Sequence, residues 1–95
     1  MTDDTMLVVS QEQVACDLQG EIAILNLKNS TYYGLNPVGA RVWELLQTPI
    51  TLADLRRNLL AEYDAEPERI GADLTALLAD LQQHQLIQVH SEANS

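Results

Sequence analysis

The chain has little cysteine and few aromatic residues. Cys16 is the only cysteine among 95 residues, which excludes an intrachain disulfide and a cluster of thiolate metal ligands. Because a free cysteine packs as a small hydrophobe, we expect Cys16 to be buried or half-buried. Phenylalanine is absent, so Leu, Ile, Val and Ala must fill the interior. The length predicts a single domain over residues 1–95 with one modest core, ordered from about residue 6 to residue 90.

Positive charge is also scarce. Five Lys and Arg residues stand against fourteen acidic residues, which gives a formal net charge of −9. Nucleic-acid-binding proteins take much of their affinity from Lys and Arg on phosphates, and an anionic lipid surface repels an acidic protein. The composition therefore argues against nucleic acid and membrane as partners, and it favours a neutral or basic peptide.

Long apolar runs and targeting signals are missing as well. No stretch approaches the roughly 20 apolar residues that a membrane-spanning helix needs. The first five residues include two aspartates and no Lys or Arg, whereas a secretory signal begins with a positively charged segment. We therefore expect a soluble, cytoplasmic protein.

Motifs that support catalysis are absent from the sequence. His84 and His90 lie far from Cys16, and no glycine-rich nucleophile turn surrounds a serine. No His and Cys residues have zinc-site spacing, no acidic loop resembles a calcium site, and no glycine pattern is suited to phosphates. The sequence predicts a protein that is not an enzyme and needs no metal or cofactor.

Hydrophobic periodicity predicts strands in the first third and helices in the rest. The expected strands are Met6–Ser10, Val14–Leu18 and Glu21–Lys28, with Gln19-Gly20 as a two-residue turn. The expected helices begin at Pro37 after an Asn36 N-cap, after a Thr51 N-cap, and at Pro67, the last one ending near His84. A short strand at Ile87–Val89 follows. This order predicts an α+β, winged-helix-like fold with a three-stranded antiparallel sheet followed by a three-helix bundle.

The Glu21–Lys28 strand is the first candidate for function. It would come last in a three-stranded meander and would therefore lie at an edge, where backbone groups are unpaired. It contains no proline and carries charge only at its two ends. A guest peptide that added as a further strand would satisfy this edge.

The third helix is the candidate second wall of a peptide groove. Its apolar face is wide and comprises Leu74, Leu77, Leu78 and Leu81. A core role for Leu74 and Leu78 is the competing interpretation. The rim would hold Asp73, Ala76 and Asp80, whose carboxylates would attract a Lys or Arg of the guest.

The aromatic residues have mostly structural interpretations. Trp43 is expected to be a core anchor, because a tryptophan buries a large area. Tyr32 and Tyr33 point to opposite sides of an extended segment, so one is expected in the core and the other exposed or at the groove. The sequence does not decide which of Tyr32 and Tyr33 faces the core.

The block from Tyr32 to Leu46, YYGLNPVGARVWELL, combines an extended segment, a turn, a capped helix and the tryptophan. It resembles the signature of the pyrroloquinoline quinone biosynthesis protein D family. Within that family it is most similar to the stand-alone leader-binding proteins, or precursor peptide recognition elements, of lasso-peptide gene clusters. The resemblance extends from about Met6 to Val89. It implies a non-catalytic domain that binds the leader of a ribosomal precursor peptide between its third strand and its third helix.

The resemblance also implies partners. These are a leader protease of the transglutaminase-like cysteine type and a macrocyclase, with no nucleic acid or membrane. Relatives in the wider family serve radical-SAM enzymes, which is the first alternative. A winged-helix transcription regulator is a second, but it would need a basic third helix, and that helix offers Arg69 alone. An adaptor that binds an enzyme but no peptide is a third.

The residues predicted to bind the peptide come from the third strand, the tyrosine pair and the third helix. They are Ile22, Ala23, Ile24, Leu25, Asn26, Leu27, Lys28, Tyr33, Asp73, Leu74, Ala76, Leu77, Asp80 and Leu81.

Overall fold

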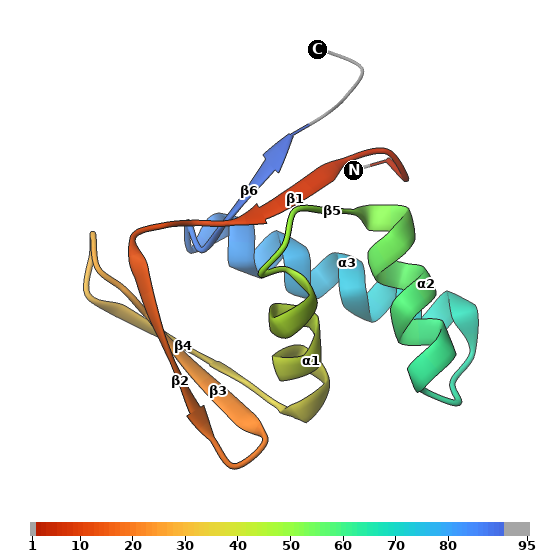
Figure 1. Ribbon diagram of the computed structural model, residues 1–95, viewed down its shortest axis with the longest axis horizontal. Coiled ribbons are helices and arrows are strands. Elements are labelled where there is room, and N and C mark those ends of the chain that lie inside the picture. Colours follow the sequence, from red (N-terminus) through yellow and green to blue (C-terminus); the bar gives the residue numbers. More distant parts are fainter. Residues whose placement is uncertain (1, 91–95) are drawn as a thin grey trace.

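The computed structural model describes residues 2–90 and places two small sheets around three helices (Figure 1). The strands are β1 (Met6–Val9), β2 (Gln13–Leu18), β3 (Glu21–Asn26), β4 (Thr31–Leu35), β5 (Ile50–Thr51) and β6 (Ile87–His90). The helices are α1 (Pro37–Leu45), α2 (Leu52–Glu62) and α3 (Pro67–Gln83). A three-stranded antiparallel sheet followed by three helices confirms the predicted α+β class.

The antiparallel sheet is a meander in the order β2-β3-β4. Gln19 and Gly20 form the first turn, both with positive φ of 59° and 93°, as a two-residue hairpin turn requires. In the second hairpin, Ile24 pairs with Tyr33 and Asn26 pairs with Thr31. The prediction that the Glu21–Lys28 strand lies at an edge is therefore wrong, because β3 is the central strand.

The third strand ends earlier than expected because Asn26 closes the second hairpin. Its side-chain oxygen accepts a hydrogen bond from the Lys28 N–H at 2.8 Å, and its carbonyl accepts one from the Ser30 N–H at 2.8 Å. The chain reverses over these residues, and the segment from Thr31 returns along β3 as a fourth strand. The extended segment predicted around Tyr32 and Tyr33 is thus a full member of the sheet.

The first strand does not join the meander. It lies between β5 and β6 in a second antiparallel sheet, where Leu7 pairs with Ile50 on one side and with Val89 on the other. This arrangement corrects the expectation that Met6–Ser10 begins the meander. It confirms the predicted terminal strand, and it brings the two ends of the described chain side by side (Figure 1).

The helices begin where the capping residues predict. The Asn36 side chain accepts a hydrogen bond from the Gly39 N–H at 2.8 Å, and the Thr51 side chain accepts one from the Asp54 N–H at 3.2 Å. The third helix stops because Gln85 adopts a left-handed conformation (φ 59°) and the Leu86 N–H bonds back to the Leu81 carbonyl at 2.9 Å. This end directs the chain into β6.

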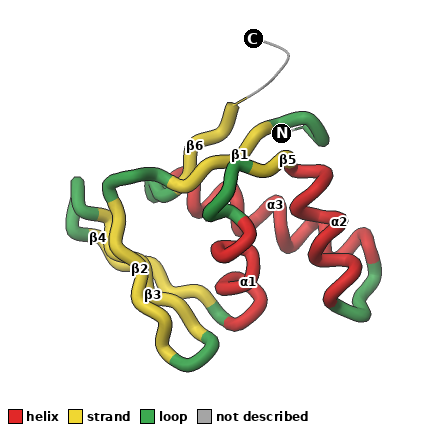
Figure 2. The backbone as a smooth tube through the Cα atoms, in the orientation of Figure 1, coloured by secondary structure: helices red, strands yellow, loops and turns green. Residues whose placement is uncertain are grey.

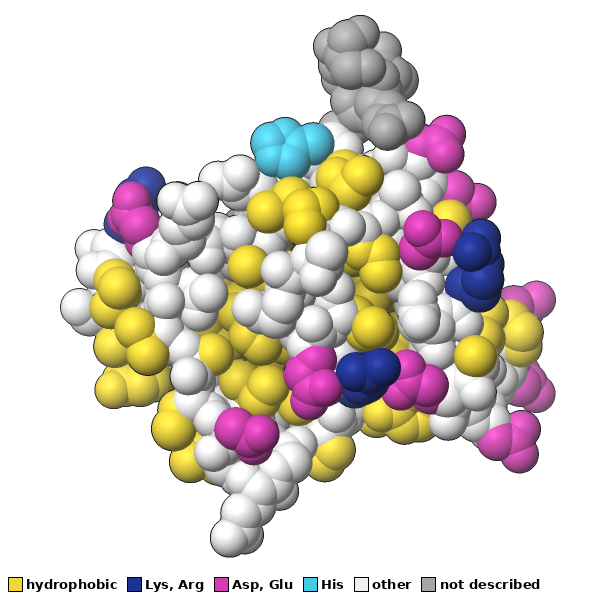
Figure 3. All heavy atoms as spheres, in the orientation of Figure 1, with side chains coloured by type: hydrophobic (Ala, Val, Ile, Leu, Met, Phe, Trp, Pro, Cys, Tyr) yellow, Lys and Arg dark blue, Asp and Glu magenta, His cyan; other side chains and the backbone are white. Residues whose placement is uncertain are grey.

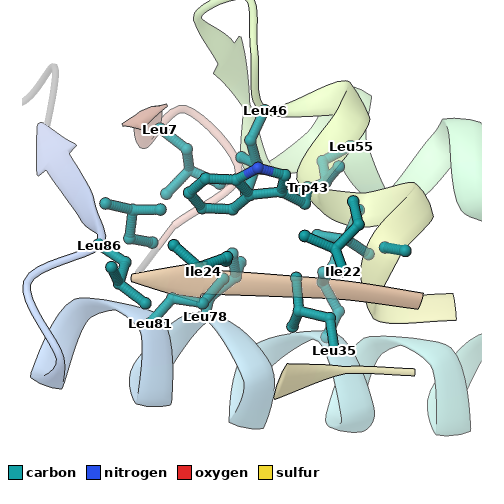
Figure 4. Close-up of a cluster of buried hydrophobic side chains, with 14 of the residues drawn as sticks. Leu7, Ile22, Ile24, Leu35, Trp43, Leu46, Leu55, Leu78, Leu81 and Leu86 are labelled. Atoms are coloured by element: carbon teal, nitrogen blue, oxygen red, sulfur yellow. The ribbon is translucent and has the colours of Figure 1, made fainter. Parts of the chain in front are cut away.

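Figure 2 shows how the meander, the second sheet and the three helices are arranged, and the core side chains lie between them (Figure 4). Trp43 is only 3% exposed and packs among leucine and isoleucine side chains from every layer, which confirms its predicted role as core anchor. Ile22 and Ile24 reach the same cluster from β3. The core therefore fixes the meander and α3 relative to each other, and this sets the geometry of the site described next.

Candidate functional site

The outer edge of β4 is an open strand edge. The Leu27 N–H donates to the Glu12 carbonyl at 3.0 Å, and this bond fixes which pairs of the β2–β3 ladder are hydrogen-bonded. Hydrogen-bonded and non-hydrogen-bonded pairs alternate along an antiparallel ladder. The N–H and C=O groups of Ile24 therefore point away from β2 and toward Tyr33 on β4. The same alternation turns the N–H and C=O groups of Tyr32 and Gly34 away from β3. These four groups face the side on which β4 has no strand neighbour in residues 2–90.

The third helix stands opposite this edge. Its backbone packs closely against α2 and β6 rather than β4, so long side chains span the space between strand and helix. The Tyr33 hydroxyl donates to Asp80 Oδ2 at 3.3 Å, and the Tyr33 ring meets the His84 ring edge-on at 5.0 Å. The buried Asn26 side chain donates to the His84 carbonyl at 2.7 Å. Together these contacts hold the C-terminal part of α3 at a fixed distance from the meander.

Toward the N-terminal half of α3, the space widens into a cavity of about 440 Å³. Its wall is mainly apolar and is contributed by all three helices and β4. The lining includes Leu35, Val38, Val42, Leu59, Tyr63, Ile70, Leu74 and Leu77. A hollow of this kind accepts large apolar side chains. We call the cavity and the adjoining β4 edge the β4–α3 groove.

Charge on the groove comes from α3. Asp73 forms an exposed ion pair with Arg69 at 3.7 Å, one turn earlier on the helix. Asp80 has no basic partner among the described residues and instead accepts the hydrogen bond from Tyr33. Burial, the nearby Asp80 charge and that hydrogen bond raise the pKa of the Tyr33 phenol above its ordinary value. The phenol therefore stays protonated and remains a donor in the groove at neutral pH.

The residues predicted on the third strand do not meet at this groove. Ile22, Ile24 and Asn26 are buried and face the core, whereas Ala23 and Leu25 face the opposite side of the sheet. Both edges of β3 are occupied by β2 and β4. Leu27 and Lys28 lie in the exposed turn after β3. The predicted backbone pairing with Ile22–Lys28 is therefore wrong, because a guest strand would first have to displace a native one.

Most of the residues predicted on the third helix lie at the groove. Asp73, Leu74 and Leu77 line the cavity, and Asp80 lies beside Tyr33. Ala76 is exposed on the same helical stripe, between Asp73 and Asp80. Leu81 is fully buried in the core, so its predicted contact with a guest is wrong (Figure 4).

The tyrosine pair is now assigned. Tyr33 points inward to the groove, and Tyr32 points outward with 72% of its surface exposed. The inference from sequence missed Gly34 and Leu35 as groove residues. No clear signal for them was present in the sequence, because Tyr32 and Tyr33 are the same residue type and the segment is short, although in the structure Tyr33 is half-buried and Leu35 buried while Tyr32 and Gly34 are exposed.

Residues 2–90 contain no group of three His, Cys, Asp or Glu side chains that would hold a metal ion. Within the same range, no helix has both the length and the apolar character needed to cross a membrane.

The fold and groove define a winged-helix-like α+β domain with an open strand edge beside an apolar cavity. The family model for coenzyme PQQ synthesis protein D (PqqD) matches residues 21–87, and the chain belongs to this family. This membership confirms the resemblance read from the Tyr32–Leu46 block.

Two solved structures are similar to this chain. One is TbiB1 in complex with the TbiA(beta) leader peptide, with 28% identity and a TM-score of 0.79 over 85% of this chain and 94% of that one. The other is a lasso peptide synthetase B1 complexed with the leader peptide, with 21% identity and a TM-score of 0.75 over 86% and 96%. The second likeness is one of fold alone. Comparison with curated proteins gives no match.

Proposed function

We propose that this chain binds the leader segment of a ribosomal precursor peptide as an added strand on β4, in the β4–α3 groove, and catalyses no reaction itself. The observation that carries the proposal is the open edge at Tyr32 and Gly34 beside a mainly apolar cavity. Strand addition satisfies such an edge, and neighbouring pockets read alternate side chains of the guest. The leader peptide bound to TbiB1 supports the same kind of ligand here.

The groove selects its guest in two ways. The cavity beside Ile70, Leu74 and Leu77 takes a large apolar side chain. At the narrow end, Asp80 attracts a Lys or Arg, because it has no basic partner among the described residues. Asp73 contributes less, since Arg69 already balances its charge. The guest is an extended segment with an apolar anchor and a positive charge.

The partners of such a domain are enzymes that act on the remainder of the precursor. We propose a leader protease of the transglutaminase-like cysteine type and a macrocyclase, working in the cytoplasm where the precursor is made. A radical-SAM peptide-modifying enzyme is the alternative, and the same groove would serve it. A transcription regulator is disfavoured, because Arg69 on α3 is paired with Asp73 and Arg56 on α2 with Asp3.

Titration with the leader peptide of the same biosynthetic system tests the proposal, with backbone amide NMR shifts as the readout. A scrambled peptide of the same composition is the control for non-specific attraction. We expect saturable shifts concentrated on 32–35 and 73–80, and none with the scrambled peptide. Absence of binding, or shifts centred on Arg56 and Arg57, would contradict the proposal.

A further inference from the structure

The face of the meander that points away from α1 is mainly apolar and is uncovered in residues 2–90. Register places seven side chains on it: Val14, Cys16 and Leu18 from β2, Glu21, Ala23 and Leu25 from β3, and Tyr32 from β4. All of them except Glu21 are uncharged. We call this surface the outer face. Val14 is 54% exposed and Leu18 56% exposed. Hydrophobic side chains are seen along the left edge of the molecule, over this sheet, in Figure 3.

The polarity of β2 is inverted relative to a sheet with one face in water. An antiparallel sheet that covers a core normally turns polar side chains outward and apolar ones inward. Here Val14, Cys16 and Leu18 point outward, while Gln13 and Asp17 lie on the side of the helices. Cys16 is exposed, so the expectation that it is buried is wrong. A strand with this pattern is suited to being covered on its outer side.

The charges around the outer face are mainly acidic. Glu21 lies on it, Glu12 is exposed at its other end, and neither takes part in the ion pairs formed within residues 2–90. Lys28, in the turn after β3, is the basic residue at the Glu12 end. The arginines are all paired with acids elsewhere, on the helical side. Two copies meeting through this face would bring like charges together in a chain of net charge −9. A surface rimmed with Lys or Arg complements it instead.

The middle of the outer face is also shaped for a close approach. Cys16, Ala23 and Gly34 form one row of small residues across the three strands, beside a row of larger ones made by Val14, Leu25 and Tyr32. A Cβ atom added to Gly34 would meet nothing within 4 Å, so the packing of the free chain leaves room for a side chain there. A glycine within a strand often marks a site where another backbone comes close.

We propose that the outer face docks a protein whose contact surface is apolar at its centre and basic at its rim. This inference rests on the proposed function, because we identify that protein with the leader protease that acts on the held precursor. The outer face and the β4–α3 groove share β4 but use its opposite sides. Tyr33 faces the groove and Tyr32 the outer face, so guest and protease are bound at the same time.

The experiment titrates the full chain with the leader protease of the same biosynthetic system by calorimetry. The test variant carries Val14→Thr and Leu18→Thr, which keep strand-forming residues but remove apolar surface far from the β4 edge. The matched control is Ala15→Thr on the same strand, whose side chain points to the other side of the sheet. Leader-peptide affinity is measured for every variant in parallel.

We expect the double variant to bind the protease roughly tenfold or more weakly, since apolar residues at the centre of an interface dominate its affinity. The Ala15→Thr control and all leader affinities should stay within about twofold of the wild type, a margin of roughly 0.4 kcal/mol. Glu21→Gln should reduce the salt dependence of protease binding.

Protease affinity that is unchanged in the double variant, or absent in the wild type, overturns the docking proposal. A wild-type dimer that the double variant dissociates also overturns it in favour of a second copy. Failure of the leader to bind contradicts the proposed function alone, because protease binding is measured without the leader.

Discussion

The Tyr33 hydroxyl reaches from β4 across to the Asp80 carboxylate on α3, with the oxygens 3.3 Å apart. The two residues are 47 positions apart in sequence, and their contact joins the two walls of the groove. Asp80 is the described acid on this helix that is best placed to meet a positive charge on a guest. The contact therefore links the ionisation of one groove residue to the charge of another.

Asp80→Asn should lower the pKa of Tyr33 toward its ordinary value of 10.0. Burial, the largest cause of the raised pKa, remains in the variant, whereas the repulsion between carboxylate and phenolate disappears. Because folding raises this pKa, the associated stability is present below pH 10 and is lost as the pH rises through the folded-state value. Absorbance titration of the phenolate measures the change, with Tyr33→Phe to assign the signal.

The same variant tests how the guest is selected. Asp80→Asn should weaken binding of a leader that carries Lys or Arg and flatten its salt dependence, whereas Asp73→Asn should change both less. Equal effects of the two substitutions would show that the groove attracts the guest through net charge alone.

Much of the fold follows from local chemistry in the sequence. Asn36 and Thr51 cap helices because their side chains satisfy N–H groups three residues on, and both sites are readable from a few letters. Gln19-Gly20 forms a tight turn for a similarly local reason. The core position of Trp43 was predicted correctly, because in a chain of this size few positions other than the core can bury so large a side chain.

The position of the groove depends on pairing between distant segments, and the edge strand was therefore predicted wrongly from the sequence. Tyr32–Leu35 is too short for alternation to reveal a strand, so β3 looked like the last strand and hence the edge. Asn26 decided the outcome by closing the second hairpin. Likewise Met6 pairs with His90 at the other end of the described chain, and no local pattern predicts that sheet.

Leu77 and Leu81 should separate binding from stability. Leu77 is partly buried and lines the cavity, so Leu77→Ala should lower leader affinity about tenfold. Leu81 is fully buried, so Leu81→Ala should cost about 2–5 kcal/mol of unfolding free energy. Calorimetry and urea denaturation measure the two effects. If Leu81→Ala weakened the affinity of the folded protein as much as Leu77→Ala did, the wall of the groove would have to be redrawn.

Asn26 should matter for stability more than its size suggests. It is 2% exposed, and its side chain donates to the His84 carbonyl and accepts from the Lys28 N–H. Asn26→Ala removes both of these partly buried hydrogen bonds, which should cost about 1–3 kcal/mol. Urea denaturation measures the loss. Asn29→Ala, in the exposed turn, is the control and should change stability far less.

Gly34→Pro tests strand addition directly. The Gly34 N–H points to the open edge, so proline at this position removes a donor that forms no hydrogen bond in the free fold. Edge strands tolerate proline at such positions. Loss of one backbone hydrogen bond to the guest should weaken leader binding roughly 3- to 10-fold. Ala15→Pro is the matched control, because the ladder alternation also turns the Ala15 N–H outward, on the β2 edge away from the groove. Calorimetry with the leader should show a loss for Gly34→Pro alone, with circular dichroism unchanged in both variants. A loss of equal size in Ala15→Pro would instead place the guest on β2, and unchanged affinity in both would mean that the guest binds through side chains without joining the sheet.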